Sequence, residues 1–289
     1  MKKILNIALP AILIAGLFTA CSKESTNPSK ENSVALNKSL APVPSSDDWE
    51  QVPGAGTDIS AGANNAVFAI NTTLVTTTRG YQVVKWDSIG STWNVIPGGA
   101  GIRIAVDPTG NPWVVDNSNL IYKYNGTAWT QLPGTGTDIG IGANGLVYAI
   151  NTTLVTTTGG YQVVKWNTST SSWDVVPGGA GVRIAVDGSG MLWVVNKSHL
   201  IYKYNGTTWT QMPGTATDIA AGGFASSNNK IFIVGTTQVS PTGGYRISMW
   251  NGSGWTDTVS GAGINVTVDW MGHPWATNAS NLIYRNRNI

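Results

Sequence analysis

The sequence predicts an all-β fold, a six-bladed β-propeller built from four-stranded antiparallel blades. Three observations predict it. The composition is poor in charge and rich in glycine and tryptophan, with 11% charged residues, 35 Gly, and 13 Trp against 4 Phe. A tryptophan-led segment recurs six times, and every repeat holds four short strand-like runs separated by Gly, Asn and Thr. Such punctuated runs are typical of all-β proteins, and no stretch has the period of a long amphipathic helix.

The N-terminus predicts a processing segment that lies outside the fold. Two lysines precede an apolar run over 4–17, which is shorter than the ~20 residues of a membrane-spanning helix. The segment LFTAC (17–21) resembles a bacterial lipobox, although Phe18 stands where Leu is usual. Ordinary secretory cleavage fits less well, because it favours a small residue at that position. We therefore expect residues 1–20 to be a lipoprotein signal peptide and Cys21 to be the lipid attachment site.

A flexible tether is predicted between the anchor and the repeats. Residues 21–48 are rich in Ser, Asn, Lys and Pro and carry few large apolar side chains, so they cannot bury a core. Cys21 is the sole cysteine, which excludes an intrachain disulfide and a multi-cysteine zinc site. We expect a monomer in the bacterial cell envelope, held to the outer membrane by its N-terminal lipid.

Charge and residue types also exclude several functions. Without Lys2 and Lys3, 15 basic side chains (17 − 2) balance 15 acidic ones, whereas nucleic-acid-binding domains present a basic surface. The two histidines, His199 and His273, lie in separate repeats, and no cluster has the spacing of metal ligands. No nucleophile and base stand out together. We expect no nucleic-acid partner, no metal, no cofactor and no catalysis.

The repeat determines the expected number of blades. Its copies begin at Trp49, Trp93, Trp129, Trp173, Trp209 and Trp255. Most continue to a Pro-Gly pair, as WTQLPG does at 129–134. The spacings are 44, 36, 44, 36 and 46 residues, so the full period is a pair of units present three times. Segments 71–86 and 151–166 differ only at Arg79 and Gly159. Units of this length with four strands each are typical of propeller blades.

The two ends of the repeat region predict how the ring closes. The pattern starts with a lone tryptophan-led strand at 49–52 and finishes with a third strand at 282–286, without a fourth. The first strand can supply the outer strand of a last blade made from about 263–289, which removes the open edges. The predicted domains are the signal peptide 1–20, the tether 21–48 and the propeller 49–289.

Over residues 49–289 the repeat resembles the tectonin family. The resemblance is carried by the Trp…Pro-Gly segment, the Asp-Ile or Arg-Ile strand after it, a Gly-rich turn, an aromatic strand and IYKYNG (121–126 and 201–206) before the next Trp. It implies a six-bladed propeller. From the best-known members it also implies a lectin, with a glycan or polysaccharide as the ligand.

The first strand of each blade carries a polar residue at one aligned position. These residues are Asp58, Arg103, Asp138, Arg183, Asp218 and Asn265. Acid and base alternate until the last copy, which predicts ion pairs between blades near the axis, because buried charges need partners. The alternative is that Arg103 and Arg183 project into the channel mouth and bind an anionic group. For the repeat-starting tryptophans, we expect packing between blades rather than sugar stacking.

Three Thr-rich hairpins distinguish the longer blades. They span 72–80, 152–160 and 236–244, between the second and third strands, and should crown one face of the ring. Their hydroxyl groups suit a hydroxyl-rich ligand, and Tyr81, Tyr161 and Tyr245 directly after them are candidates for stacking on a sugar ring. The alternative is that these are long hairpins with solvated threonines.

Two aromatic residues interrupt the repeat on the opposite face. Trp270 lies in the turn DWMG (269–272), and Phe224 lies in a widened loop. An exposed Trp in a turn is a binding candidate, although it could also cap a neighbouring loop.

Together these residues predict a lectin-like envelope lipoprotein that binds glycans multivalently through one face. The alternative is a protein-interaction platform at the cell surface without sugar binding.

Overall fold

The computed structural model of the chain describes residues 49–62, 64–223 and 229–289. The predicted signal peptide, the tether and Phe224 lie outside these residues. Within them the chain forms 23 β-strands, and every strand pair is antiparallel. No helix in these ranges is long and apolar enough to cross a membrane. The prediction of an all-β protein with antiparallel four-stranded sheets is confirmed.

The strands of the described ranges form four sheets of four strands and one of seven. The first two sheets are β2 (Asp58–Ala61), β3 (Val67–Thr76), β4 (Gly80–Asp87) and β5 (Thr92–Gly101), then β6 (Arg103–Val106), β7 (Pro112–Val115), β8 (Leu120–Tyr124) and β9 (Trp129–Thr135). The third sheet is β10 (Asp138–Ile141), β11 (Val147–Thr156), β12 (Gly160–Asn167) and β13 (Ser172–Gly181).

The seven-stranded sheet is β14 (Arg183–Val186), β15 (Leu192–Val195), β16 (Leu200–Tyr204), β17 (Trp209–Gly222), β18 (Lys230–Ser240), β19 (Gly244–Trp250) and β20 (Trp255–Gly263). The last sheet is β21 (Asn265–Val268), β22 (Pro274–Thr277) and β23 (Leu282–Arg285), with β1 (Glu50–Ala55) as its outer strand.

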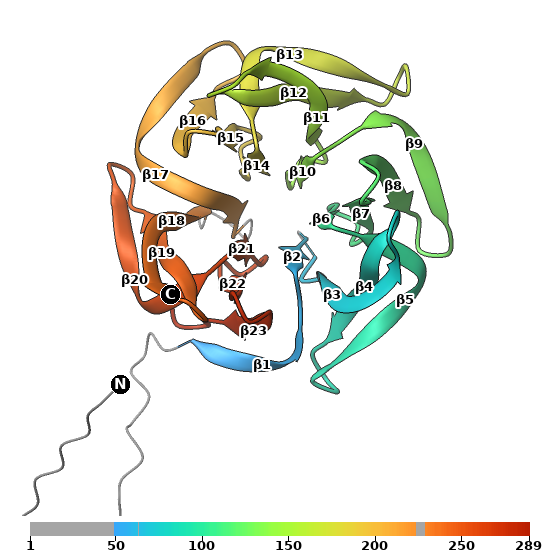
Figure 1. The fold of residues 1–289 in the computed structure, drawn as a ribbon, viewed down its shortest axis with the longest axis vertical. Helices are drawn as coiled ribbons and strands as arrows, with labels where there is room; N and C mark the ends of the chain where they lie inside the picture. The colour runs from blue at the N-terminus through green and yellow to red at the C-terminus, as the bar shows by residue number, and fades with distance from the viewer. Residues whose placement is uncertain (1–48, 63, 224–228) are drawn as a thin grey trace, which may run out of the picture. The chain divides into compact units, whose positions relative to one another are not determined.

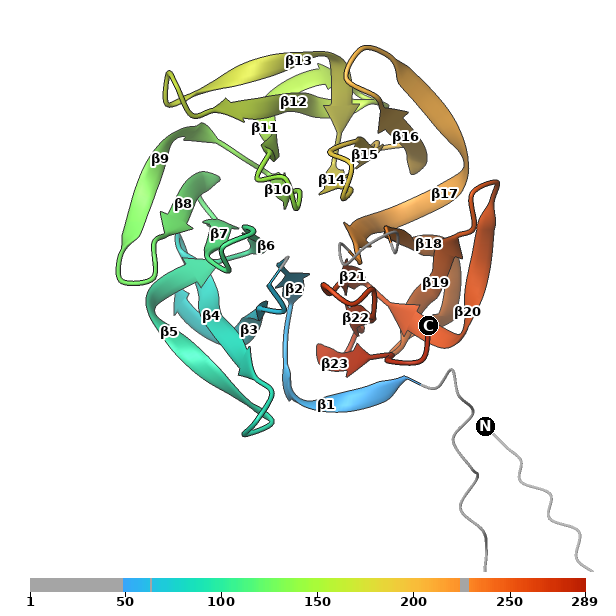
Figure 2. The same cartoon turned by 180° about the vertical axis from the view of Figure 1, so that it is seen from behind.

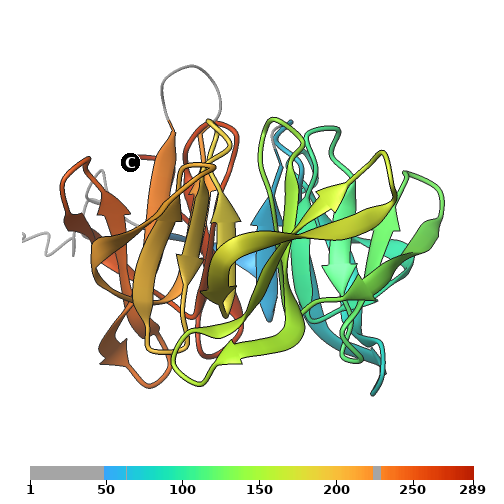
Figure 3. The ribbon, with the colours of Figure 1, turned by 90° about the horizontal axis from the view of Figure 1, so that it is seen from above.

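The sheets stand around a central axis, with short first strands near the axis and longer strands at the rim (Figure 1; Figure 2 from behind). The innermost strands β2, β6, β10, β14, β17 and β21 contact one another in this order, and β21 also contacts β2. From above, the strands run between two ends at which the turns gather (Figure 3). Because the strands are antiparallel, successive turns of a sheet lie at alternate ends.

The first strand of the domain pairs with the last. In this register Glu50 lies opposite Arg285, and Val52 lies opposite Ile283. Nε of Arg285 also donates to Oε2 of Glu50 at 3.0 Å. Both Val52 and Ile283 are buried in a cluster with Ile59 of β2, so apolar burial joins the two ends of the domain.

Burial falls from the axis to the rim, and the residue types follow it. In the second sheet, β7 is buried at all four positions, as its sequence PWVV suggests. By contrast, β9 is half-buried or exposed throughout and reads WTQLPGT. Polar residues therefore concentrate on the outer strands, where water can solvate them.

The hydrophobic core lies between the sheets. Of the six clusters in the described ranges, five combine residues from two neighbouring sheets, and the sixth packs the two halves of the seven-stranded sheet against each other. One of them, for example, packs Trp113, Val115 and Ile121 of the second sheet against Val147 and Val164 of the third. No sheet therefore buries its apolar faces without its neighbours.

One strand differs from the expectation of separate four-stranded units. The first half of β17 pairs with β16 and its second half with β18, which merges two units into one seven-stranded sheet. At the equivalent points the other copies carry Gly56 and Gly136, where the strands end, but β17 carries Ala216. Glycine weakens a strand interior, so its replacement by Ala216 favours a continuous strand.

Five of the six repeat-starting tryptophans donate a hydrogen bond to the Pro-Gly segment of the preceding unit, whereas Nε1 of Trp49 is buried without a hydrogen-bond partner among the described residues. Nε1 of Trp173 donates to the carbonyl oxygen of Pro133 at 2.8 Å. The same bond recurs at Trp93, Trp129, Trp209 and Trp255. A Cβ atom at Gly134 would lie 2.9 Å from Cδ1 of Trp173, so the glycine makes room for the indole. The Trp…Pro-Gly motif is thus a contact between neighbouring repeat units, and the predicted packing role of these tryptophans is confirmed.

We predict that Gly134→Ala destabilises the fold more than Gly145→Ala. Both glycines have positive φ, 85° and 77°, but a Cβ at Gly145 would meet nothing within 4 Å. Gly145→Ala should cost about 1–2 kcal/mol of unfolding free energy from its left-handed backbone. Gly134→Ala should cost about 1–3 kcal/mol more, because the new methyl group displaces Trp173. Urea unfolding measures both; equal losses would contradict the docking role.

Candidate functional site

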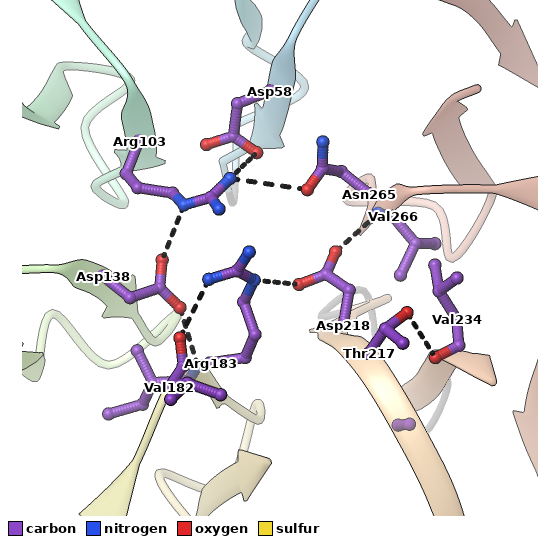
Figure 4. A network of polar contacts seen from close by, with 12 residues as sticks. Asp58, Arg103, Asp138, Val182, Arg183, Thr217, Asp218, Val234, Asn265 and Val266 are labelled. Atoms are coloured by element: carbon purple, nitrogen blue, oxygen red, sulfur yellow. Dashed lines mark hydrogen bonds and ion pairs between the residues drawn. The ribbon is translucent and has the colours of Figure 1, made fainter. Parts of the chain in front are cut away.

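Six side chains from the innermost strands meet at the central axis (Figure 4). They are Asp58, Arg103, Asp138, Arg183, Asp218 and Asn265. Nη1 of Arg103 lies 3.8 Å from Oδ1 of Asp58, and its Nε lies 3.9 Å from Oδ1 of Asp138. Nε of Arg183 lies 3.4 Å from Oδ1 of Asp218. Ion pairs therefore join neighbouring innermost strands at the axis, as the alternating sequence predicts.

The aspartates of this ring also bind the backbone of the next sheet. Oδ2 of Asp58 accepts a hydrogen bond from the backbone N–H of Ile104 at 2.9 Å. Asp138 and Asp218 repeat the contact in their own units, with N–H donors at 2.9 and 2.8 Å. Each carboxylate thus holds two sheets together through one oxygen and faces a guanidinium with the other.

The ring has one basic side chain fewer than acidic ones. Asn265 stands where the alternation would place a third arginine. Its Nδ2 donates to the carbonyl oxygen of Thr57 at 2.7 Å, and its Oδ1 accepts from Nη1 of Arg103 at 3.5 Å. Three carboxylates therefore share two guanidinium groups.

The burial of the ring and the repulsion among its carboxyl groups change the acidity of the aspartates. Burial raises the pKa of Asp58 to about 6 and the pKa of Asp218 to about 7, although Arg103 and Arg183 respectively act to lower them. Burial also raises the pKa of Asp138. Charged forms are disfavoured where water is excluded, so the ring favours retaining a proton near neutral pH.

The space at the ring is small. Its volume is about 70 Å³, and aliphatic residues line it together with the three aspartates. At roughly 30 Å³ per water molecule, it holds about two waters. The ligand-binding role predicted for Arg103 and Arg183 stays a prediction, because both guanidinium groups already face carboxylates of the ring.

The predicted tyrosines lie at the base of the three Thr-rich hairpins. Tyr81, Tyr161 and Tyr245 are the second residues of β4, β12 and β19, and each is half-buried. Each packs against one of the hydrophobic clusters between sheets. Their stacking on a sugar stays a prediction.

Apolar side chains are exposed on the same hairpins. They are Leu74, Val75, Leu154, Val155 and Val239, with 47–53% of each residue's surface exposed. They occupy equivalent positions in three sheets, because the hairpins β3–β4, β11–β12 and β18–β19 correspond to one another. We call these five residues the hairpin patch.

Trp270 lies in the turn between β21 and β22, at the opposite end from the hairpins, as predicted. It is half-buried. At this same end, a cleft of about 790 Å³ lies between the second and third sheets. Trp270 does not line this cleft.

The cleft mixes aromatic and charged side chains. Nζ of Lys123 lies 4.9 Å from the ring centroid of Trp113 and 3.9 Å from Oδ2 of Asp107. Lys165 and the half-buried Trp166 enter from the third sheet. Cation–π contacts of this kind orient lysine side chains over an indole. The cleft therefore offers both positive charge and an aromatic surface to a ligand.

Sequence reasoning favoured packing for Trp113 and assigned no ligand-binding role to the other cleft residues. One usable signal exists, because Lys123, Lys203 and Arg285 occupy equivalent positions, and each places its cation over a tryptophan ring. The hollow itself depends on how two sheets splay apart, which no local pattern encodes.

No protein-family model matches the chain, and no curated protein matches it. Among solved structures, a chain of "Crystal Structure of Mitotic Checkpoint Complex" is similar over 84% of this chain and 95% of its own length, with a TM-score of 0.53 and 10% identity. A chain of "YCF48 bound to D1 peptide" is similar over 82% and 95%, with a TM-score of 0.47 and 13% identity. These neighbours have folds of the β-propeller type, and the first supports a propeller-like fold for this chain.

We predict that the ring makes the fold less stable as the pH rises. The folded-state pKa values of Asp58 and Asp218 lie above the ordinary 3.8, so the folded protein binds more protons than the unfolded chain. This contribution is complete below about pH 4 and is lost as the pH rises through about 6 to 7.

Asp218→Asn should flatten this pH dependence, by up to about 1.4 kcal/mol per pH unit for one titrating group. Unfolding by urea between pH 4.5 and 7.5 measures it. The control Asp257→Asn changes an exposed ion pair with Arg246, so its slope should match the wild type. A wild-type slope retained in Asp218→Asn would refute the assignment to the ring.

Proposed function

We propose that this protein is a non-catalytic, protein-binding scaffold of the cell envelope, and that the hairpin patch is its docking surface. The hairpin patch carries the proposal. Five aliphatic side chains, each about half exposed, recur at equivalent positions of three sheets. Single exposed apolar residues are common on proteins, but a repeated set on one class of loop is typical of an interaction surface.

The fold supports this proposal in part. The neighbour with a TM-score of 0.53 is, by its title, from a complex. A propeller-type domain offers loops from several sheets at one end, and a large partner can contact them together. Fold alone does not determine function, so the proposal rests on the hairpin patch and on the binding experiment below.

We propose further that the sheets form six blades and that β1 closes the ring. The pairing of β1 with β23, the apolar cluster that both strands share with β2, and the contact of β21 with β2 support this. The seven-stranded sheet then counts as two blades joined through β17. The tectonin-like repeat fits this arrangement, since its Trp…Pro-Gly contact links one blade to the next.

Carbohydrate binding is the second candidate function. The cleft between the second and third sheets favours it, because Trp166, two lysines and several amide and hydroxyl groups line a volume of about 790 Å³. Sugar-binding sites combine aromatic surface with placed polar groups. Tyr81, Tyr161, Tyr245 and Trp270 remain the other candidates for this role.

We predict that serine at the hairpin patch abolishes partner binding without unfolding the protein. The variant carries Leu74→Ser, Val75→Ser, Leu154→Ser, Val155→Ser and Val239→Ser. Exposed apolar residues contribute little to folding but much to a docked interface. Crosslinking on intact cells followed by affinity purification should recover a defined partner with the wild type and not with this variant.

The matched control is Val95→Ser with Val175→Ser. These valines are also about half exposed, but they lie on the outer strands β5 and β13. The control should bind as the wild type does. Equal loss in both variants, or a partner retained by the patch variant, would refute the docking surface. Binding of the patch variant to a glycan array, without any protein partner, would favour the second candidate.

We also propose that Cys21 carries the lipid and that residues 21–48 tether the domain. The lipobox-like segment LFTAC supports it. Cys21→Ser is expected to move the protein from the membrane fraction to the soluble fraction of the envelope, since the acyl chains anchor it. Fractionation with detection by antibody measures this; membrane retention of the variant would contradict a lipid anchor.

A further inference from the structure

Two nearly identical repeats differ at one hairpin position, and this difference opens a pocket. Segments 71–86 and 151–166 are the same apart from Arg79 in the first and Gly159 in the second. The hairpin turn is alike in both. The backbone N–H of Arg79 donates to Oγ1 of Thr76 at 2.9 Å, and that of Gly159 to Oγ1 of Thr156 at 2.7 Å. The two copies therefore differ by an arginine or a glycine at one position of the same hairpin.

In the first copy, the head of Arg79 lies against the neighbouring sheet. Its Cζ is 4.6 Å from the ring centroid of Tyr122, and its Nη2 donates to the carbonyl oxygen of Gly98 at 3.3 Å. Its Nε lies 4.0 Å from Oδ2 of Asp116, a carboxylate that is 99% buried. The guanidinium thus spans from an acidic side chain to a backbone carbonyl, over an aromatic face.

In the second copy, the same place is a pocket of about 340 Å³. Gly159, Gly178, Asn196, Tyr202 and Trp209 contribute to its walls. These residues correspond to Arg79, Gly98, Asp116, Tyr122 and Trp129 of the first copy. The ring and the carbonyl group that hold the guanidinium are retained, whereas the arginine and its carboxylate partner are both replaced.

The orientation of Asn196 follows from its hydrogen bonds. Its Oδ1 accepts from the backbone N–H groups of Ser198 and Leu200, both at 2.9 Å. Oδ1 of Asp116 makes the same two bonds at 2.8 and 2.9 Å. The amide oxygen is fixed by these donors, so Nδ2 of Asn196 takes the place of the carboxylate oxygen that faces Arg79.

Asn196 thereby brings an unused donor to the pocket. The residue is only 7% exposed, and no hydrogen bond among the described residues uses its Nδ2. An amide N–H group that borders a pocket and has no acceptor within the protein is a ready partner for a ligand oxygen. The third copy repeats the pair with Gly243 and Asn278.

We propose that the pocket at Gly159 binds an uncharged carboxamide group, supplied as an Asn or Gln side chain by the protein partner. In a guanidinium, Nε and Nη2 are joined through one planar carbon, as the oxygen and nitrogen of a carboxamide are. The ligand oxygen accepts from Nδ2 of Asn196 where Nε of Arg79 faces Asp116. The ligand nitrogen donates to the carbonyl oxygen of Gly178, and the amide plane lies on Tyr202.

A guanidinium fits the second-copy pocket less well. It would direct an N–H donor at the N–H donor of Asn196, so one hydrogen bond is lost and the two facing N–H groups repel each other. The source of the amide rests on the proposed protein-binding function. The pocket chemistry does not, because a small amide tests it without a partner.

The experiment uses the full chain with propionamide, ethylguanidinium and N-acetylglucosamine as probes. Side-chain amide and indole N–H signals in nitrogen-15 NMR spectra report binding at Asn196 and Trp209. Propionamide should shift these signals with a dissociation constant in the millimolar range, as expected of so small a ligand. Ethylguanidinium should bind about tenfold more weakly, owing to the lost hydrogen bond.

Two exchange variants convert one copy into the other. Gly159→Arg with Asn196→Asp should fill the pocket and abolish the shift at Trp209. A Cβ at Gly159 would lie 2.6 Å from Oγ1 of Thr156, a rotatable group, and Arg79 already stands beside Thr76 in the same way. Arg79→Gly with Asp116→Asn should open a pocket in the first copy, reported by a new propionamide shift at Trp129.

Three results would overturn the proposal. They are stronger binding of ethylguanidinium than of propionamide to the wild type, a Trp209 shift that persists in the filled variant, and no shift with propionamide up to its solubility limit. N-acetylglucosamine binding at far lower concentrations than propionamide would assign the pocket to a sugar, and so overturn the protein source. Val155 belongs to both the hairpin patch and the pocket wall, so these outcomes are measured on the wild type and the exchange variants alone, where no protein partner is needed.

Discussion

The whole domain depends on the burial of each sheet against its neighbours. A four-stranded sheet of this sequence has apolar side chains on both faces, and the clusters that bury them each draw on two sheets. The Trp…Pro-Gly contact sets the distance between neighbours at the rim, because the indole needs the space that a glycine leaves. A sheet at the end of the series would expose an apolar face. The cluster that β1 and β23 share with β2 covers it.

The same constraint acts at the axis, where the sheets crowd together. Six polar side chains converge there with little room for water, so each must find its partner among the others. The aspartates satisfy this by binding a guanidinium and a backbone N–H at once. Burial, together with repulsion from the neighbouring aspartates, raises the pKa of Asp218, and Asn265 brings no positive charge to oppose this. The stability of the axis is therefore coupled to pH through its buried carboxyl groups.

The sequence predicts the repeated parts of this structure well, because each repeat shows the same pattern of strands and turns again. The all-β class, the four-strand units, the packing of the tryptophans and the ion pairs at the axis follow from it. The continuity of β17 was missed, since it depends on Ala216 in place of a glycine. The cleft beside Lys123 and Trp166 was missed because its residues come from two sheets. Position 79/159 was visible as a difference, but the pocket it opens requires the neighbouring sheet.

Near-identity of the copies makes their few differences informative. Two copies that share a backbone and nearly all contacts should also share any purely structural role. The paired exchange of Arg79 and Asp116 for Gly159 and Asn196 keeps charge balanced in both. Charge balance alone does not explain the pocket. Two apolar side chains at positions 159 and 196 would also be uncharged, and they would fill the space. Retaining Tyr202, the carbonyl group of Gly178 and an amide with a free donor keeps the recognition surface while removing its internal occupant. The first copy is therefore filled by its own arginine, whereas the second copy leaves the same polar groups accessible to a ligand.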